Sequence, residues 1–248
     1  MKVILLLCFF IMLPVQSKEK LSIAFGDALA PWVIPKSDSG ILIDIIKEAF
    51  KPLDYELNFI YYPYLRRVIA FKNDEVDVVC DINPKTIEGK NLKGHFSGEV
   101  YFYENYAFSL QENNYHFKHL SELSNYSLMS WQGAIMHLGG EYAEMATKNS
   151  NYIESHNQLT QLKMLFSKRV QVIQLDEKIF NYYRMQLLKE DNNLAITKVD
   201  KFPLFGRSPN GFLFKDKKIK DNFLEQLALM KQDGRYDSIF EKYAPNLE

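Results

Sequence analysis

The stretch Tyr64–Thr86, YLRRVIAFKNDEVDVVCDINPKT, predicts a helix, a turn, a buried strand and a polar loop, and the rest of the chain is organised around it. Apolar residues at helical spacing predict one buried helix face, with the cationic side chains off that face. The buried face would carry Leu65, Val68 and Ile69, and the residues off it would be Arg66, Arg67 and Lys72. The β-branched run 76–80 then predicts a strand covered on both faces.

Three polar residues follow this strand, namely Asp81, Asn83 and Thr86. In an open α/β sheet, ligands bind beyond the carboxyl ends of the strands. We therefore expect these three side chains to contact a ligand. For Asp81 the alternative is a turn-forming role.

The composition is that of an ordinary globular protein, with 248 residues, 47% hydrophobic and 25% charged residues, and a net charge of −1. This length suffices for one large domain or two modest lobes. The net charge gives no reason to expect binding to nucleic acid or to an anionic membrane. No phosphate-binding loop, nucleophile motif or zinc-ligand spacing occurs, so we expect no cofactor and no metal.

Residues 1–17 have the pattern of a secretory signal peptide. A positive start is followed by the apolar run 3–13, and Val15-Gln16-Ser17 resembles a cleavage site. The run is too short to span a bilayer, although an uncleaved anchor is the alternative. Cys80 is then the single cysteine of the mature chain, so no intrachain disulfide is expected, which fits the bacterial periplasm.

Strands and helices alternate twice along the chain, and one unit is inserted into the other. The β-α-β order predicts parallel strands with right-handed crossovers. We predict an α/β fold of two lobes, each with a central mixed sheet, joined by two hinge strands. Lobe 1 would comprise 18–107 and 207–248, and lobe 2 would comprise 108–206. Such lobes close over a cleft by hinge motion.

Other candidate ligand contacts follow predicted strands in both units. Asp27 and Trp32 follow the first strand, where an aromatic ring can stack on a flat or cationic group, and packing between the lobes is the alternative for Trp32. Tyr64 follows the second predicted strand, near the same end of the sheet, and is a further candidate to line the cleft. In the second unit, Asp176 follows a strand and either contacts the ligand or caps the next helix. The exit loop of another strand contributes Trp131, Gln132 and Gly133, and a helix N-terminus there can hold an anion.

Segments scattered over nearly the whole mature chain resemble family 3 of the periplasmic solute-binding proteins, in that family's order. They are Ala30-Pro31-Trp32, Gly40–Ile46, Pro63–Asp77, His95-Phe96-Ser97, Gly211-Phe212, Asp233–Tyr236 and Lys242-Tyr243. The resemblance implies the type II periplasmic-binding fold. It also implies that a monomer captures a small polar solute, without catalysis, and passes it to a membrane permease or receptor.

The chain departs from this family at the residue that binds a carboxylate. Amino-acid-binding members carry a Thr-x-Glu-Arg motif whose Arg binds the ligand's α-carboxylate, but here the motif ends in Gly89. An Arg gives a bidentate grip that a Lys cannot reproduce. Lys90 is adjacent, and Arg66 or Arg67 could reach in from the start of the predicted helix; solvent exposure of both arginines is the alternative. The resemblance further implies that Asp176 holds the ligand's amine.

Two other functions fit the same scaffold, since fold does not fix function, and a degenerate scaffold that binds no small ligand is a third alternative. One is a ligand-presenting sensor or adaptor without transport. The other is a dehydratase-like enzyme, which would need a general acid or base such as Asp176 or Glu88 and a residue that binds carboxylate. The missing Arg argues against the enzyme.

Overall fold

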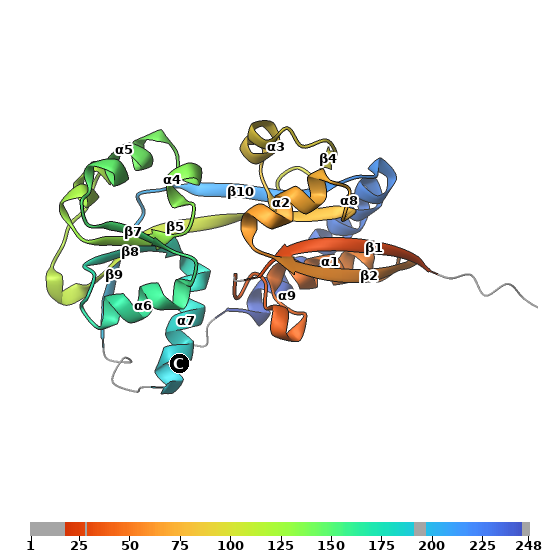
Figure 1. Ribbon diagram of the computed structural model, residues 1–248. Helices are drawn as coiled ribbons and strands as arrows, with labels where there is room; N and C mark the ends of the chain where they lie inside the picture. The colour runs from red at the N-terminus through yellow and green to blue at the C-terminus, as the bar shows by residue number, and fades with distance from the viewer. Residues whose placement is uncertain (1–17, 28, 191–196, 245–248) are drawn as a thin grey trace, which may run out of the picture.

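The computed structural model describes residues 18–27, 29–190 and 197–244, so the predicted signal peptide lies outside the described residues. The elements form two lobes (Figure 1). Lobe 1 contains β1 (Glu19–Gly26), α1 (Ile41–Phe50), β2 (Tyr55–Tyr62), α2 (Tyr64–Lys72), β3 (Val78–Ile82), α3 (Pro84–Lys90), β4 (His95–Phe96), α8 (Lys217–Gln232) and α9 (Arg235–Lys242). Lobe 2 contains β6 (Leu128–Trp131), α4 (Ala134–His137), α5 (Gly140–Lys148), β7 (Tyr152–Ser155), α6 (Gln158–Phe166), β8 (Val172–Asp176), α7 (Glu177–Glu190) and β9 (Val199–Phe202).

Two long strands, β5 (Tyr101–Leu110) and β10 (Arg207–Phe214), run between the lobes (Figure 1). They pair antiparallel where they cross, with Tyr101 opposite Asn210 and Glu104 opposite Arg207. These are the two predicted hinge strands. The predicted lobe boundaries fall inside or at the end of these strands, and their placement stays a prediction.

Each lobe has a mixed sheet, as the α/β prediction required. The strand order is β2-β1-β3-β10-β5-β8-β6-β7, with β4 beside β10 and β9 beside β5. In lobe 1, β1 is parallel to β2 and β3, and β10 is antiparallel to β3. In lobe 2, β6 is parallel to β7 and β8, and β5 is antiparallel to β8 and β9.

The buried face of α2 differs from the predicted one. Leu65 and Ile69 are 50% and 49% exposed, and the buried residues of this helix are Arg67, Val68, Ala70 and Phe71. Val68 and Phe71 pack into a cluster with Val79 of β3. Arg67 can share this face because Asp81 pairs with its charge.

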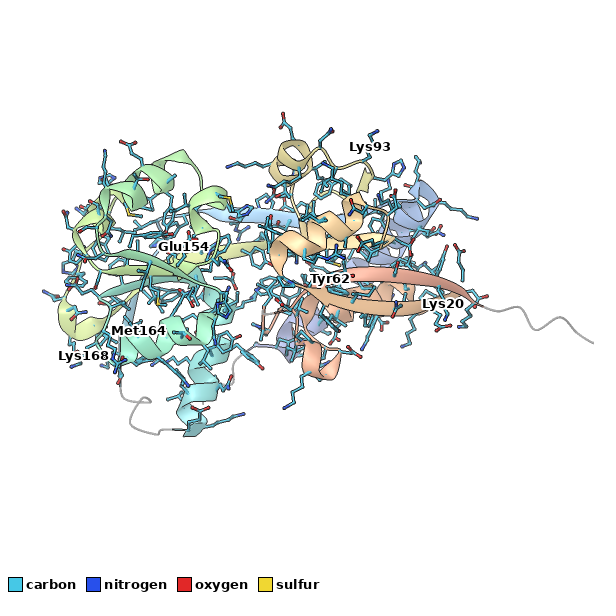
Figure 2. All side chains as sticks on the ribbon, viewed as in Figure 1. Lys20, Tyr62, Lys93, Glu154, Met164 and Lys168 are labelled. Carbon is cyan, nitrogen blue, oxygen red and sulfur yellow. The ribbon has the colours of Figure 1, made fainter. Side chains whose placement is uncertain are left out.

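The polar stretch after β3 is also more ordered than predicted. Asp81 lies within β3, and Thr86 lies in α3, whose N-cap is Asn83. The parallel strands of lobe 1 point their carboxyl ends toward lobe 2 (Figure 1). In Figure 2, Tyr62 at the end of β2 lies on the side of lobe 1 that faces lobe 2. Among the described residues, no helix combines the length and the hydrophobicity needed to cross a bilayer.

Candidate functional site

A cavity of about 450 Å³ lies between the lobes and is lined by both of them and by both hinge strands. Its walls from lobe 1 are Gly26, Asp27, Leu29, Pro63, Tyr64, Arg67, Asp81 and Asn83. The hinge strands contribute Tyr103, Asn105, Ser208 and Asn210. Lobe 2 contributes Trp131, Gln132, His137, Leu138, Ser155, His156, Gln158, Asp176 and Ile179. A volume of several hundred cubic ångströms is typical of small-molecule sites.

The carboxyl ends of the parallel strands of both lobes converge on this cavity. Asp27 follows β1, Tyr64 follows β2, and Asp81 lies near the end of β3. In lobe 2, Trp131 ends β6 and Asp176 ends β8. The cavity therefore lies at the strand ends, where the sequence argument expects a ligand to bind.

Arg67 and Asp81 form a buried ion pair in the lobe 1 wall. Arg67 is only 1% exposed, and its Nη2 donates to Asp81 Oδ2 at 3.0 Å and to the Asp81 carbonyl oxygen at 3.3 Å. Burial is the largest single influence and lowers the pKa of Arg67, but Asp81, together with Tyr64 and Tyr103, outweighs it, and the pKa is raised. The cation thus stays charged without access to bulk water.

Two tyrosines of the hinge strand β5 hold the Asp81 carboxylate. Tyr103 donates to Asp81 Oδ1 at 2.9 Å, and Tyr101 donates to the same oxygen at 3.2 Å. Burial, together with the charge of Asp81, raises the pKa of both phenols well above the usual value, so both remain donors. Asp81 itself adopts a left-handed backbone conformation with φ of 62°.

Asp176 in the lobe 2 wall connects three parts of the molecule. Its Oδ1 accepts from the indole Nε1 of Trp32 in lobe 1 at 2.9 Å, and its Oδ2 accepts from the backbone N–H of Glu104 in the hinge at 2.9 Å. Oδ1 also accepts from the backbone N–H groups of Lys178 and Ile179 at the start of α7. Both roles weighed from the sequence are therefore compatible, since Asp176 caps a helix and lines the cavity. Burial raises its pKa to about 6, despite these hydrogen bonds.

Aromatic rings of the cavity wall connect the two lobes. Trp131 and His137 of lobe 2 stack with ring centroids 5.7 Å apart, and Tyr64 of lobe 1 meets His137 edge-on at 5.0 Å. Burial lowers the pKa of His137, so the neutral ring is favoured. Lys85 of α3 also reaches across, with its Nζ 3.5 Å from the carbonyl oxygen of Met136. Through these contacts the two lobes touch each other, so the structure is a closed arrangement of the lobes.

Three polar atoms in the cavity wall are buried and have no hydrogen-bond partner among the described residues. They are Arg67 Nε, His137 Nε2 and Gln158 Oε1. Unpaired buried polar atoms are uncommon because each one forfeits its hydration. Three of the six such atoms among the described residues belong to this one wall, which therefore has a concentration of polar groups. The described residues contain no group of three or more His, Cys, Asp or Glu side chains arranged to hold a metal ion.

Most of the predicted site residues line this cavity. They are Asp27, Tyr64, Asp81, Asn83, Trp131, Gln132 and Asp176. Their contacts with a ligand remain predictions.

Four predicted residues do not line the cavity. Trp32 is fully buried, as a donor to Asp176 and packed on Tyr101 and Tyr103. Thr86 is buried in α3, where its N–H donates to the Asn83 carboxamide. The N–H of Gly133 donates to Glu154 Oε2 at 2.8 Å.

Arg66 is the fourth. It lies on the outer surface of α2 with both terminal nitrogens on Glu75. The cation in the cavity wall is its neighbour Arg67, because α2 is rotated from the predicted face.

Sequence reasoning named Arg67 beside Arg66 as a possible replacement for the missing arginine, but it missed the polar residues of the hinge strands and of the later lobe 2 loops. The missed residues are Tyr103, Asn105, Ser208, Asn210, His137, Ser155, His156 and Gln158. Helical spacing could have favoured Arg67 over Arg66, since Arg67 lies three residues after Tyr64. Ser155 ends β7 and His156 follows it, so the strand-end argument could also have found these two residues.

The comparisons with known proteins agree with this geometry. The profile of the bacterial extracellular solute-binding proteins, family 3, matches residues 21–246. The chain belongs to this family. No curated protein sequence matches the chain.

Solved structures of similar fold come from several kinds of protein. The GluR0 ligand-binding core in complex with L-glutamate has a TM-score of 0.73 at 13% identity, covering 92% of this chain and 99% of that one. A histidine kinase sensor domain with similarity to periplasmic binding proteins has a TM-score of 0.71 at 15% identity, covering 92% and 96%. The substrate-binding protein of an amino acid ABC transporter has a TM-score of 0.63 at 17% identity, covering 90% and 98%. At these identities the likeness shows a shared fold.

Proposed function

We propose that this family member captures a small, polar, amino-acid-like solute between its lobes in the periplasm, does not convert it, and delivers it to an ABC importer. The observation that carries the proposal is the cavity between the lobes, whose wall contains buried polar atoms without partners. A solute that pairs with these atoms stabilises the closed arrangement by its extra affinity for that state.

The kind of solute is suggested by the chemistry of the wall. Three carboxylates, one guanidinium and several amides face one cavity, together with aromatic rings from both lobes. This set suits a small molecule that carries both donors and acceptors. Two of the three structurally similar proteins named above have an amino acid in their description, as ligand or as transported substrate.

A sensor role is the second candidate, because one protein of the same fold is the sensor domain of a histidine kinase. In that case the closed form would be recognised by a receptor and the solute would not be transported. Deletion of the gene separates the two roles. Loss of uptake of the labelled solute supports import, whereas unchanged uptake with loss of a transcriptional response supports sensing.

The proposal is tested by a thermal-shift screen of the protein expressed from its full-length gene, against amino acids, oligopeptides, polyamines, organic acids and sugars. A ligand at about 100 times its Kd adds roughly 2.7 kcal/mol, which raises the Tm of a chain of this size by about 5–10 °C. Mass spectrometry of the recovered solute distinguishes binding from conversion. Absence of a shift with every class would contradict solute capture.

A matched pair of variants locates the binding site. Gln158→Ala removes an unpaired acceptor from the cavity wall and leaves no protein group without a partner. We expect it to weaken binding of the screened solute about tenfold. Gln232→Ala, at the exposed end of α8, serves as the control and should bind normally. Equal affinity of the two variants would place the solute elsewhere.

A further inference from the structure

The charged side chains that line the cavity are mostly negative. Asp27, Asp81 and Asp176 contribute three carboxylates, and Arg67 is the only Arg or Lys among the described residues of the lining. Burial lowers the pKa of His137, which favours its neutral ring. With the histidines counted as neutral, three negative charges against one positive charge give the lining a formal charge of −2.

The single cation of the lining is already paired and buried. Arg67 Nη2 donates to the Asp81 carboxylate at 3.0 Å and to the Asp81 carbonyl oxygen at 3.3 Å. The Arg67 side chain is covered almost wholly by protein, and its Nε is among the buried atoms. Arg67 therefore neutralises the charge of Asp81, and it presents almost no accessible donor to a ligand carboxylate.

The two other positions at which an anion was expected also give little to a ligand carboxylate. Gly89 stands where the Thr-x-Glu-Arg motif would supply an arginine. In the loop after β6, the N–H groups of Gly133 and Ile135 donate to Glu154 Oε2 and Oε1 at 2.8 and 3.1 Å. The Tyr152 hydroxyl donates to the same carboxylate at 2.8 Å. A carboxylate of the protein itself thus uses the donors of this loop.

Two lysines of α3 lie near the cavity but outside its lining. Lys85 and Lys90 are close enough to His137 to lower its pKa, although neither lines the cavity. Lys85 Nζ instead donates to the carbonyl oxygen of Met136 at 3.5 Å. Both lysines weaken the negative potential near His137, but they supply no charge that contacts a molecule inside the cavity.

The accessible groups of the lining suit a cation. The Asp27 carboxylate is exposed and makes no ion pair or hydrogen bond among the described residues. Trp131 and Tyr64 line the cavity from opposite lobes, and the faces of such rings attract organic cations. In a site partly removed from water, a net negative wall favours a cation over a zwitterion, because the carboxylate of the zwitterion would lose its hydration without gaining a partner.

From this arrangement we infer that the solute is an organic cation without a carboxylate, namely an aliphatic amine or guanidine. The inference rests on the proposed function and narrows its class of solute. Such a molecule has the cationic end of an amino acid but not its acid group. Its ammonium or guanidinium group pairs with Asp27 and lies against the ring of Trp131 or Tyr64.

The first test compares amines with the amino acids that carry one additional carboxylate, by titration calorimetry of the full-length gene product. The pairs are agmatine with L-arginine, cadaverine with L-lysine, and putrescine with L-ornithine. For whichever pair binds, the amine should bind at least about tenfold more tightly, because the carboxylate is desolvated without a donor. Equal or tighter binding of the amino acid would overturn the inference while leaving solute capture in place.

A matched pair of variants tests the contact with Asp27. Asp27→Asn removes the unpaired carboxylate of the lining and leaves no described protein group without its partner. It should weaken the amine at least about tenfold. Asp237→Asn removes the same charge from an exposed position of α9 outside the lining, and should change the affinity by less than about twofold. Equal affinities of the two variants would overturn the role of Asp27.

The salt dependence of binding separates charge from shape. The affinity for the amine should fall as sodium chloride is added, because screening weakens its attraction to the negative wall, and it should fall less in Asp27→Asn. An affinity that does not change with salt would contradict selection by charge. If the solute screen yields only carboxylates or uncharged compounds, the inference fails and solute capture stands. If no solute of any class binds, both fail.

Discussion

At Asp176, burial disfavours the charged carboxylate and raises its pKa, while hydrogen bonds to the carboxylate lower that pKa. It is 3% exposed, and burial raises its pKa from the usual value of 3.8 to about 6. Between these two pH values the folded protein binds more protons at this site than the unfolded chain does. Its contribution to the free energy of unfolding therefore falls as pH rises through that window, by up to about 3 kcal/mol.

We therefore expect the ligand-free protein to lose stability between pH 4 and pH 6 through this residue, and Asp176→Asn to lack that component. Urea denaturation of both proteins across the window measures it. An identical pH dependence of the two proteins would show that Asp176 titrates normally.

Trp32 has a structural role in place of the predicted ligand contact. Its indole N–H is one of the donors that keep the pKa of Asp176 from rising further. Trp32→Phe should destabilise the protein by about 1–3 kcal/mol, because it removes a donor from a buried carboxylate, and should raise the pKa of Asp176. Chemical denaturation at pH 7, with Trp131→Phe as the tryptophan control, tests this; unchanged stability of Trp32→Phe would contradict it.

At the scale of elements, the position of α2 determines which arginine enters the cavity. Val68 and Phe71 lie on the buried face of α2, and Ile69 lies on the exposed face. Ile69→Gln should therefore change the free energy of unfolding by less than about 0.5 kcal/mol. Phe71→Ala should cost about 3–5 kcal/mol. Denaturant unfolding of both variants gives the comparison. A large loss of stability in Ile69→Gln would instead support the buried face of α2 that was predicted from the sequence.

The boundaries of α2 and the existence of β3 could be predicted because their periodicities are strong. The helix runs over Tyr64–Lys72 in the structure, as expected. Its rotation could not be predicted, because Leu65 and Ile69 have the same spacing as a buried face, and only the ion pair with Asp81 shows that Arg67 can replace them. Long-range pairing of charges is not encoded in local spacing.

For the site, the strand-end rule located Asp81, Asn83, Trp131 and Asp176 because parallel strands share one edge. The rule could not find the hinge residues Asn105 and Asn210, which lie within strands. The Thr-x-Glu-Arg comparison indicated a missing arginine at Gly89, but it could not show that an arginine from another helix borders the same cavity.

For the whole molecule, the aromatic contacts between the lobes contribute to the balance between the open and closed states. His137→Ala removes the ring that meets Tyr64. An aromatic pair contributes about 0.5–1.5 kcal/mol, so the closed state should lose population and the apparent affinity should fall about two- to tenfold. Small-angle scattering of the ligand-free variant should show a larger radius of gyration.

The control for this experiment is His116→Ala, since His116 is exposed and does not line the cavity. Its radius of gyration should match that of the wild type. An unchanged radius in His137→Ala as well would mean that the hinge strands alone determine the lobe arrangement.

The chain contains only two tryptophans, and they lie on opposite sides of the lobe interface. Trp131 borders the cavity and stacks on His137, and Trp32 donates its indole N–H from one lobe to a carboxylate of the other. The protein thus carries a native pair of fluorophores. In Trp131→Phe the remaining emission comes from an indole whose surroundings change when the lobes separate, so its wavelength reports opening without any attached dye. In Trp32→Phe the remaining emission reports occupancy of the cavity.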